Sequence, residues 1–405
     1  MKIVYVTNTI HRGGAEEYLI RLCENLIIKN SIYVIIPHID GTNGIISELK
    51  EIGIECIDLK LYNQNIFSKF KAIFNRSLSK AHSIENNDSQ SVKDKLLVKI
   101  KYLFDYISSF IIEKEIKKIN PDIVHFNLHD VKRQYPSISK ISKKFKCIVT
   151  LHLVPPNFSL LNEKEQKKDL LKSIQNKTKY FAVSNTNAKL FSNAIEFKID
   201  YIYNGIKINN LINFKKEDRD IFIKKYKIPQ DNTIFATVGR IDYTQKDYIT
   251  IIKAMSKLKE TSNNITLVIV GDGGHMDRLK KDIKKYKLEN NIVLTGYIRD
   301  VNLIYKSIDC LIFSTKYEGF PLVLLEAMSY HSNIIASDID TTKELIKDQY
   351  NGLLFKAGKY EDLLRVLKNN LIILKSKQFK DEINDTLINF SEEKMINRII
   401  NEYKK

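Results

Sequence analysis

Long apolar runs are missing from this 405-residue chain. No stretch of 18 or more apolar residues occurs, which argues against a membrane-spanning helix. The opening residues, MKIVYVTNTIHRGG, are typical of a strand that runs into a glycine turn, and not of a cleavable leader. We therefore expect a cytoplasmic protein without a transmembrane span.

Cysteines are few and unpaired in the sequence. The four of them, Cys23, Cys56, Cys147 and Cys310, are widely separated and form no C-x-x-C motif. Such spacing argues against both a zinc site and a disulfide framework. We expect buried, reduced thiols.

Acidic residues are outnumbered, with 48 Asp and Glu against 65 Lys and Arg and a formal net charge of +17. One segment carries basic residues and no acid: Lys132, Arg133, Lys140, Lys143, Lys144 and Lys146. A solvated helix and a contact with an anionic membrane or polyanion both explain it, and the sequence leaves these open. Nucleic acid is disfavoured, because zinc-finger spacing, RNP-like strands and a basic zipper are all missing.

Hydrophobic periodicity organises the chain into two halves. Short apolar runs bounded by turn residues alternate with segments of helical spacing, which predicts parallel sheets covered on both faces. In the first half the runs are residues 2–8, 31–37, 121–127, 147–152 and 180–184, and in the second half they are residues 233–239, 265–273, 291–297, 310–315, 333–338 and 352–355.

This pattern predicts an α/β protein with two tandem Rossmann-like, doubly wound domains. We expect an N-terminal domain over 1–203 and a C-terminal domain over 204–385, with a last helix over about 386–405 that can pack back on the first domain. Sheets of this kind bind ligands at the carboxyl ends of their strands, so the two domains would face each other across a cleft.

Residues 61–118 fit the alternation poorly. A polar stretch is followed by a segment with apolar residues at helical spacing, and we favour packing of that helix on the core over a membrane-surface role. The apolar positions are Leu96, Leu97, Ile100, Leu103, Phe104, Ile107, Ile111 and Ile112.

Three glycine-rich or charged motifs lie after predicted strands. GGAEE (13–17) opens the first helix, where backbone amides and the helix dipole favour a phosphate, although a glycine turn is common for steric reasons alone. GRIDYTQK places Arg240 and Lys246 after the first strand of the second domain, where two cations suit a diphosphate. In so basic a chain, two solvated cations are the competing interpretation.

The stretch EGFPLVLLEAM (318–328) decides between these interpretations. It predicts a strand, a loop and a helix start, with Glu318 before the helix and Glu326 in its second turn. From Pro321 to Glu326 the helix rises by roughly 7 to 8 Å, the distance between the two sugars of a sugar nucleotide. Two hydroxyl-binding carboxylates therefore explain the spacing better than an acid/base pair.

Together, GGAE, GR with Lys246, GDG after a strand and the Glu-x7-Glu stretch resemble the retaining glycosyltransferases of GT-B fold called glycosyl transferases group 1. The resemblance implies that Arg240 and Lys246 hold the donor diphosphate, Glu318 the donor sugar and Glu326 the ribose. It further implies donor contacts from Gly14, Gly239, Tyr297, Ile298, Gly319, Phe320, Pro321, Leu322 and Val323. Family members usually have glycine after the lysine, where this chain has Asp247.

Three histidines follow or lie on predicted strands of the first half. His152, at the end of a predicted strand, matches a histidine that family members place beside the reacting sugar, and a buried structural histidine is the alternative. His125 and His129 are four residues apart but begin on a strand, so they would not share one face, and a metal site there is disfavoured.

The resemblance implies transfer of a sugar from a nucleotide-diphosphate donor, which we expect to be UDP-linked, to a hydroxyl of a glycan or lipid-linked acceptor in bacterial polysaccharide synthesis, such as capsule or lipopolysaccharide. It implies retention of anomeric configuration and neither a metal nor a bound cofactor, with the nucleotide-sugar as co-substrate. The expected location is the cytoplasm, with peripheral contact at the inner face of the cell membrane. A GT-B nucleotide-sugar epimerase and a non-catalytic basic binding protein are the alternatives.

Overall fold

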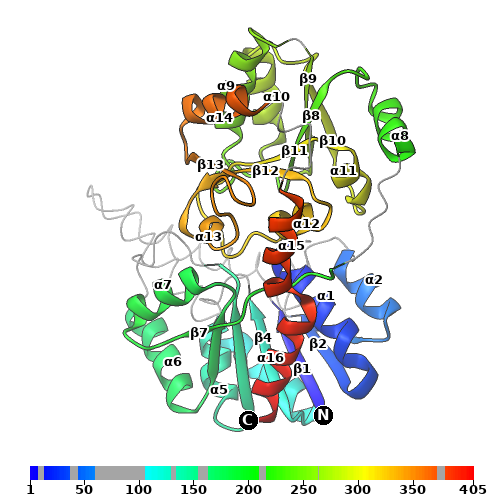
Figure 1. Ribbon diagram of the computed structural model, residues 1–405. Coiled ribbons are helices and arrows are strands. Elements are labelled where there is room, and N and C mark those ends of the chain that lie inside the picture. The colour runs from blue at the N-terminus through cyan, green and yellow to red at the C-terminus, as the bar shows by residue number, and fades with distance from the viewer. Residues whose placement is uncertain are drawn as a thin grey trace, which may run out of the picture. The chain divides into compact units, whose positions relative to one another are not determined.

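The computed structural model describes residues 1–7, 13–36, 44–59, 105–128, 134–153, 163–208, 216–262, 264–371 and 379–405. They form two compact units (Figure 1). The first unit contains Met1–Val183, Asn187–Ile202 and Ile399–Lys405, and the second contains Ser184–Thr186 and Tyr203–Arg398. The end of the chain thus belongs to the same unit as its beginning.

The first unit is built on a seven-stranded parallel sheet with the order β3-β2-β1-β4-β5-β6-β7. β-branched and aromatic residues dominate these strands, as a sheet buried on both faces requires. The strands are β1 (Lys2–Thr7), β2 (Ser31–Ile36), β3 (Glu55–Asp58), β4 (Ile123–Leu128), β5 (Lys146–Leu151), β6 (Lys179–Ala182) and β7 (Asp200–Tyr201).

Helices connect consecutive strands, because parallel strands can be joined only by crossover connections. They are α1 (Gly14–Leu26) with the short η1 (Ile27–Lys29), α2 (Gly44–Glu51), a helix over residues 105–119, α5 (Tyr135–Ile141), α6 (Glu163–Gln175) and α7 (Asn185–Ile195).

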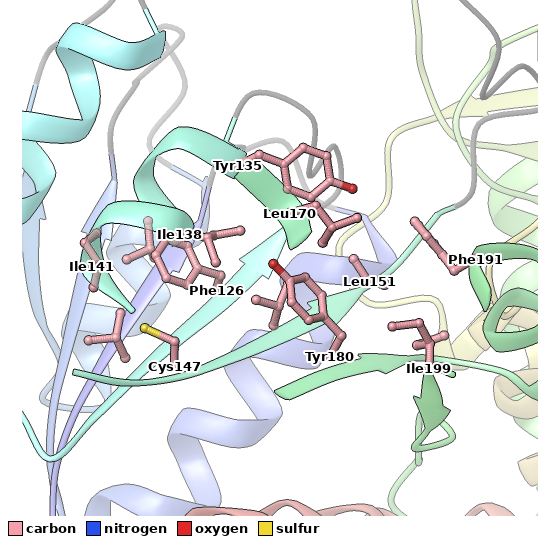
Figure 2. Close-up of a cluster of buried hydrophobic side chains, with 14 of the residues drawn as sticks. Phe126, Tyr135, Ile138, Ile141, Cys147, Leu151, Leu170, Tyr180, Phe191 and Ile199 are labelled. Carbon is pink, nitrogen blue, oxygen red and sulfur yellow. The ribbon is translucent and has the colours of Figure 1, made fainter. Parts of the chain in front are cut away.

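A cluster of buried apolar side chains packs on one face of the first unit's sheet (Figure 2). Alternate strand residues such as Phe126 and Leu151 meet apolar side chains of α5 and α6, including Ile138 and Leu170. The strand residues of the opposite phase, among them Tyr5, point to the other face, because side chains alternate along a strand. Both faces of the sheet are therefore buried.

The second unit is built on a six-stranded parallel sheet with the order β10-β9-β8-β11-β12-β13. Its strands are β8 (Thr233–Val238), β9 (Ile265–Val270), β10 (Ile292–Gly296), β11 (Cys310–Phe313), β12 (Asn333–Asp338) and β13 (Leu353–Lys356).

Its helices are α8 (Lys216–Tyr226), α9 (Tyr248–Lys259), α10 (Met276–Lys285), α11 (Asn302–Ser307), α12 (Leu322–Ser329), α13 (Asp340–Lys343), α14 (Tyr360–Asn370) and α15 (Lys380–Leu387). The short η4 (Ile388–Phe390) and α16 (Glu392–Lys404) follow, and the last turns of α16 lie in the first unit.

The predicted α/β class with two doubly wound sheets is confirmed. Two strands were not predicted from the sequence, β3 and β7, and β7 is only two residues long. Cys23, Cys147 and Cys310 are buried free thiols as expected, whereas Cys56 is half-buried. Burial raises the pKa of the Cys56 thiol to about 11.

The helix over residues 105–119 differs from its prediction. Ile112 lies in the core, but Ile107 and Ile111 are 43% and 38% exposed, so these two positions do not pack on the core. Leu96 to Phe104, like His129, Lys132 and Arg133, lie outside the described residues. In the part of the chain that the structure describes, no helix is both long and apolar enough to span a bilayer.

Candidate functional site

The predicted site residues of the second unit gather where its strand order reverses. β8 is flanked by β9 on one side and β11 on the other, so the loops after β8 and β11 leave the sheet in opposite directions. Ligands of doubly wound sheets bind at such a switch point, outside the carboxyl ends of the strands. Arg240 and Lys246 lie in the first of these loops and Glu318 in the second.

Lys246 and Glu318 form a partly buried ion pair at this point. The Lys246 ammonium donates to Glu318 Oε1 at 2.5 Å, and the side chains are only 15% and 11% exposed. The Thr315 hydroxyl donates to the same oxygen at 3.0 Å. The ammonium also lies 4.5 Å from the centroid of the Phe313 ring. Two motifs that are 72 residues apart in the sequence thus build one charged centre.

The backbones of the two loops hold this pair in place. The amide of Asp247 donates to the Ser314 carbonyl at 3.1 Å, and the amide of Lys316 donates to the Gln245 carbonyl at 2.9 Å. Lys246 and Thr315 therefore face each other in an antiparallel bridge. Because backbone hydrogen bonds fix both loops, the ion pair has a defined geometry before any ligand binds.

Arg240 is held differently from Lys246. Its side chain is 55% exposed, and its Nη2 lies 3.5 Å from both Asp242 Oδ2 and Gln245 Oε1. Burial favours the neutral form of Asp242, but hydrogen bonds from the Thr244 hydroxyl and amide outweigh it and lower the pKa of this carboxyl. Asp242 thus stays ionised and orients an Arg240 guanidinium that solvent can reach.

Two glycines allow the loops after β8 and β9 to touch backbone to backbone. Gly239 has a φ of +151°, and a Cβ placed there would meet Lys246 Cε at 3.5 Å. Gly271 has a φ of +138°, and a Cβ there would lie 2.0 Å from the Gly239 carbonyl oxygen. A side chain at Gly271 is therefore incompatible with the observed loop.

The EGFP turn leads into α12 as predicted, with one difference. Pro321 precedes the helix as its N-cap, with a φ of −81° and a ψ of 89°, and Leu322 and Val323 begin the helix. The sequence predicts Pro321 within the first helical turn, whereas the structure places it one residue before the helix. Phe320 is buried, with its ring 5.3 Å from that of Tyr203, so the turn after Glu318 and Gly319 is anchored by aromatic packing.

Glu326 lies in the second turn of α12, beside a buried tyrosine. The Tyr305 hydroxyl donates to Glu326 Oε2 at 3.1 Å, and the Tyr305 ring stacks on that of Tyr330 with centroids 5.6 Å apart. Burial and the neighbouring carboxylate raise the pKa of Tyr305, so its hydroxyl keeps its proton. The phenol therefore acts as a donor that orients the carboxylate.

Tyr297 and Ile298, the predicted nucleobase contacts, directly follow β10 at the same edge of the sheet. Tyr297 is 58% exposed. Asp247, the departure from the family pattern, is buried and precedes α9, where its Oδ2 accepts a hydrogen bond from the Thr250 hydroxyl at 2.6 Å.

In the first unit, Gly14 begins α1 directly after the N-cap residue Gly13, and His152 follows β5. His152 Nε2 lies 2.6 Å from Asn127 Oδ1, and Asn127 Nδ2 donates to the Ala15 carbonyl at 2.8 Å. A backbone carbonyl accepts only, so it fixes the orientation of the amide and leaves Oδ1 facing the imidazole. His152 Nε2 must therefore carry a proton.

His125 lies on the same face of the sheet but within the core. Its Nδ1 lies 2.6 Å from the Tyr403 hydroxyl and its Nε2 2.8 Å from the Thr150 hydroxyl. Burial lowers its pKa to about 3, so the imidazole is neutral and both nitrogens are engaged. Among the described residues, no group of three or more His, Cys, Asp or Glu side chains is placed to hold a metal ion.

Several contributors have no signal in the linear sequence. Thr315, Asn127 and Tyr305 contact Glu318, His152 and Glu326 respectively, yet each is a common polar or aromatic residue outside any motif. Asn127 can be identified as a neighbour of His152 once the strand order is known, because it lies near the end of β4, next to β5.

The comparisons with known proteins agree with this architecture. Residues 218–384 match the model of the family described as glycosyl transferases group 1. The chain is 28% identical over 195 residues to the UDP-Gal:alpha-D-GlcNAc-diphosphoundecaprenol alpha-1,3-galactosyltransferase of Escherichia coli, which covers 46% of this chain and 49% of that protein. The chain spans about half the length of this relative and of two further curated relatives, of which it covers 42% and 46%.

A longer match is found in Campylobacter jejuni. There, the GalNAc-alpha-(1->4)-GalNAc-alpha-(1->3)-diNAcBac-PP-undecaprenol alpha-1,4-N-acetyl-D-galactosaminyltransferase is 23% identical over 394 residues, covering 95% of this chain and 91% of that protein. Among solved structures, Anabaena HepE in complex with UDP and glucose superposes with a TM-score of 0.74 at 17% identity, covering 100% of this chain and 99% of that one.

Proposed function

We propose that this chain, which has the GT-B fold and whose residues 218–384 belong to the glycosyl transferases group 1, transfers a sugar from a nucleoside diphosphate to a hydroxyl of a lipid-linked glycan. The observation that carries the proposal is the Lys246–Glu318 pair at the β8/β11 switch point. It joins a cation suited to a diphosphate with a carboxylate suited to sugar hydroxyls, at the edge where this type of sheet binds ligands.

The donor diphosphate would be held by Lys246, Arg240 and the amides at the start of α12. An ammonium has three N–H donors, so Lys246 can donate to Glu318 and still donate to phosphate oxygens. Arg240 adds a planar guanidinium that solvent and ligand can reach. The amides of Leu322 and Val323, at the start of α12, lie at the same edge, where a helix N-terminus favours an anion.

Glu318 and Glu326 would bind the two sugars of the donor. Ionised carboxylates accept hydrogen bonds from hydroxyls, and in each of them one oxygen already accepts from the protein. Glu318 is tied through Oε1 and Glu326 through Oε2, which orients the other oxygen of each carboxylate. We assign the transferred sugar to Glu318 and the ribose to Glu326, with Tyr297 and Ile298 beside the base.

The reaction would break the bond between the anomeric carbon and the diphosphate oxygen and form a bond to the acceptor oxygen on the same face of the sugar. The acceptor proton passes to an oxygen of the departing diphosphate. Lys246, Arg240 and the α12 amides stabilise the negative charge that grows on this leaving group, the role in which oriented charges contribute most to catalysis. Anomeric configuration is retained, and two protein cations take the place that a metal ion holds in other transferases.

A UDP-sugar donor and a polyprenyl-diphosphate-linked acceptor are the substrates we propose. The Escherichia coli relative is named for a UDP-sugar and a diphosphoundecaprenol acceptor, and HepE was solved with UDP. His152 and Gly14 of the first unit lie at the carboxyl edge of its sheet, and we assign His152 to the reacting sugar and Gly14 to the donor diphosphate. The product would enter bacterial polysaccharide assembly, such as capsule or lipopolysaccharide.

The test removes the cations one at a time. Lys246→Ala and Arg240→Ala should each lower turnover with a UDP-sugar by about 100-fold or more, because each deletes a charge at the leaving group. Lys257→Ala is the matched control, since Lys257 pairs with Glu260 on the exposed side of α9. Near-normal turnover in both site variants would overturn the assignment. Epimer formation from a UDP-sugar alone would instead identify an epimerase.

A further inference from the structure

In residues 105–111 of the helix over residues 105–119, polar side chains are buried and large apolar side chains are exposed. Asp105, Ser108 and Ser109 are at most 7% exposed, so the buried side of these turns is polar. The outward side carries large apolar residues: Tyr106 is 46% exposed, Ile107 43%, Phe110 50% and Ile111 38%. A helix of a water-soluble surface shows the opposite pattern.

The rest of the same helix has the ordinary pattern. Ile112 and Ile116 are fully buried in the core, while Lys114, Lys117 and Lys118 are exposed. Residues three and four apart lie on one side of a helix, so the outward stripe changes from aromatic and aliphatic to cationic along its length. The exposed apolar residues are therefore confined to the first two turns.

Two of the exposed rings pack on each other, and lysines from two segments contact side chains of this helix. The rings of Tyr106 and Phe110 pack edge to face with centroids 5.3 Å apart, and the Lys140 ammonium lies over the Phe110 ring. Lys117 and Lys144 converge on the buried carboxylate of Glu113, at 2.8 and 3.5 Å. Residues 105–119 and 134–146 together contain seven lysines and three acidic residues.

We propose that this face, formed by Tyr106, Ile107, Phe110 and Ile111 with Lys114, Lys117 and Lys118, docks the protein on an anionic lipid surface. The apolar turns would enter the boundary between headgroups and acyl chains, and the lysines would meet the lipid phosphates. The centres of the two groups are about 8 residues apart, or about 12 Å along the axis, close to the depth that interfacial helices bury. The helix therefore enters tilted, with its N-terminal end deeper.

Docking on a membrane extends the proposed function, since a lipid-linked acceptor stays in the bilayer. The evidence for docking is the exposed face itself. It also changes which lysines are involved. Lys146 donates to the Tyr403 carbonyl at 2.8 Å, and Lys140 is only 21% exposed, so neither extends toward solvent as the sequence suggested. Lys117, Lys118 and Lys144, each of which pairs with Glu113 or Glu115, are 46%, 60% and 56% exposed and take their place.

The sequence contains no tryptophan, so a single one introduced by Phe110→Trp reports on this face alone. The full chain carrying Phe110→Trp should emit as a solvent-exposed indole in buffer, shift to shorter wavelength with vesicles of phosphatidylcholine and phosphatidylglycerol, and be quenched by brominated acyl chains. Ile28→Trp is the matched control, because Ile28 is 83% exposed on the same unit and belongs to a different element, η1. Its emission should not shift.

Vesicle sedimentation completes the test. Phe110→Ser with Ile111→Ser should weaken binding to the anionic vesicles at least 10-fold, Lys117→Gln with Lys118→Gln should weaken it and reduce its salt dependence, and Ile28→Ser should change nothing. UDP binding in the same samples shows whether the fold and the donor site are intact, so loss of vesicle binding alone leaves the proposed function standing.

Three outcomes would overturn the docking proposal. Emission of the Phe110→Trp protein that is already that of a buried indole without vesicles would mean that the chain covers the face itself. Concentration-dependent dimerisation that the serine variants abolish would assign the face to a second copy. Vesicle binding that all variants retain would place the membrane contact elsewhere.

Discussion

At the scale of single residues, neighbours outside the motifs orient the motif residues. Glu318 receives a hydroxyl from Thr315 as well as the ammonium of Lys246, Glu326 receives the phenol of Tyr305, and His152 faces the amide of Asn127. In each case the contact with the partner fixes the orientation of the motif residue's side chain. Supporting contacts of this kind allow a site to act without reorganising when its ligand arrives.

Replacement of Asn127 should change the behaviour of His152. Asn127→Asp keeps the acceptor facing Nε2 but adds a negative charge, so it should favour imidazolium and shift the lower limb of the pH–rate profile to higher pH. Asn127→Leu should lower turnover by about 10-fold or more, since the ring loses the group that fixes its orientation.

The matching structural readout is the ¹⁵N chemical shift of the His152 ring nitrogens. In the natural protein these shifts should indicate a proton on Nε2. In Asn127→Leu the tautomer with this proton should no longer predominate. Identical shifts and identical pH profiles in all three proteins would show that Asn127 has only a packing role.

Tyr305→Phe should weaken nucleotide binding through Glu326. Loss of one hydrogen bond to a charged group corresponds to about 1.5 to 3 kcal/mol, so the Kd for UDP should rise by roughly 10-fold or more, with kcat changing little. Because the proposed contact is to the ribose, the substitution should have no effect on binding of a 2′,3′-dideoxy nucleoside diphosphate. An equal loss for both ligands would contradict the assignment of Glu326 to the ribose.

At the scale of elements, the site of the second unit depends on how closely three loops approach one another. The loops after β8 and β11 exchange backbone hydrogen bonds, and the loops after β8 and β9 touch at glycines. This contact exists because Gly239 and Gly271 adopt backbone angles that side chains disfavour. The glycines of the GR and GDG motifs thus have a packing role that is independent of any ligand.

Gly271→Ala should disrupt this loop contact, because its Cβ would lie 2.0 Å from the Gly239 carbonyl oxygen and its φ is +138°. We expect a loss of unfolding free energy of about 2 to 4 kcal/mol together with weaker UDP binding. Gly274→Ala is the matched control three residues away, where a Cβ would meet nothing within 4 Å. Equal stability of the two variants in urea unfolding would disprove the packing role.

A buried polar network joins four elements of the first unit. Tyr5 of β1, His125 of β4, Thr150 of β5 and Tyr403 of α16 are linked by hydrogen bonds of 2.6 to 2.9 Å. Burial raises the pKa of Tyr5 and of Tyr403 and lowers that of His125, so all three groups stay neutral. Such a network is stabilising only while each member keeps its partners.

His125 should make the stability of the protein fall as the pH falls. Its pKa is about 3 in the folded chain against an ordinary value of 6.5, so below pH 6.5 the unfolded chain binds a proton that the folded chain does not. The resulting loss is about 1.4 kcal/mol per pH unit down to the folded pKa, and above pH 6.5 it is absent.

The measurement compares urea unfolding of the natural protein and His125→Gln at pH 7, 6 and 5. The variant should be less stable at pH 7, and the difference should shrink by about 2 kcal/mol by pH 5. A difference that does not change with pH would show that His125 does not titrate on unfolding in this range.

At the scale of the whole molecule, the chain crosses between its two units more than once. It leaves the first unit after Ile202 and returns to it at Ile399, so the first unit contains both ends of the chain. Tyr403 is buried there, with its hydroxyl bonded within the network and its carbonyl accepting from Lys146. The first unit therefore depends on residues 399–405 for its fold.

Removal of residues 399–405 should destabilise the first unit strongly. It deletes the buried side chains of Ile399 and Tyr403, and the Tyr5 hydroxyl and His125 Nδ1 lose their contacts with the Tyr403 hydroxyl. We expect the midpoint of thermal unfolding to fall by several degrees or more. Lys404→Ala with Lys405→Ala, which alters only exposed residues of the same segment, should leave the midpoint unchanged. Equal midpoints for the truncated and the natural chain would contradict this role of the C-terminus.

The local sequence determined most of the strands, the α/β class and the positions of the motifs after strands. This was possible because apolar alternation, turn residues and helix starts depend on residues close together in the chain. Strands β3 and β7 escaped prediction because they are short and partly exposed at the first unit's sheet edges, where burial does not impose a strong apolar pattern.

Only the tertiary structure decided which of these positions meet. Lys246 contacts Glu318 because β8 and β11 are neighbours in the sheet, and Asn127 contacts His152 because β4 and β5 are neighbours. The outward direction of Phe110 and Ile111 was decided in the same way, since helical spacing alone does not say which side of a helix faces the core. Periodicity is a local property of a sequence, whereas pairing and facing depend on residues that are distant in it.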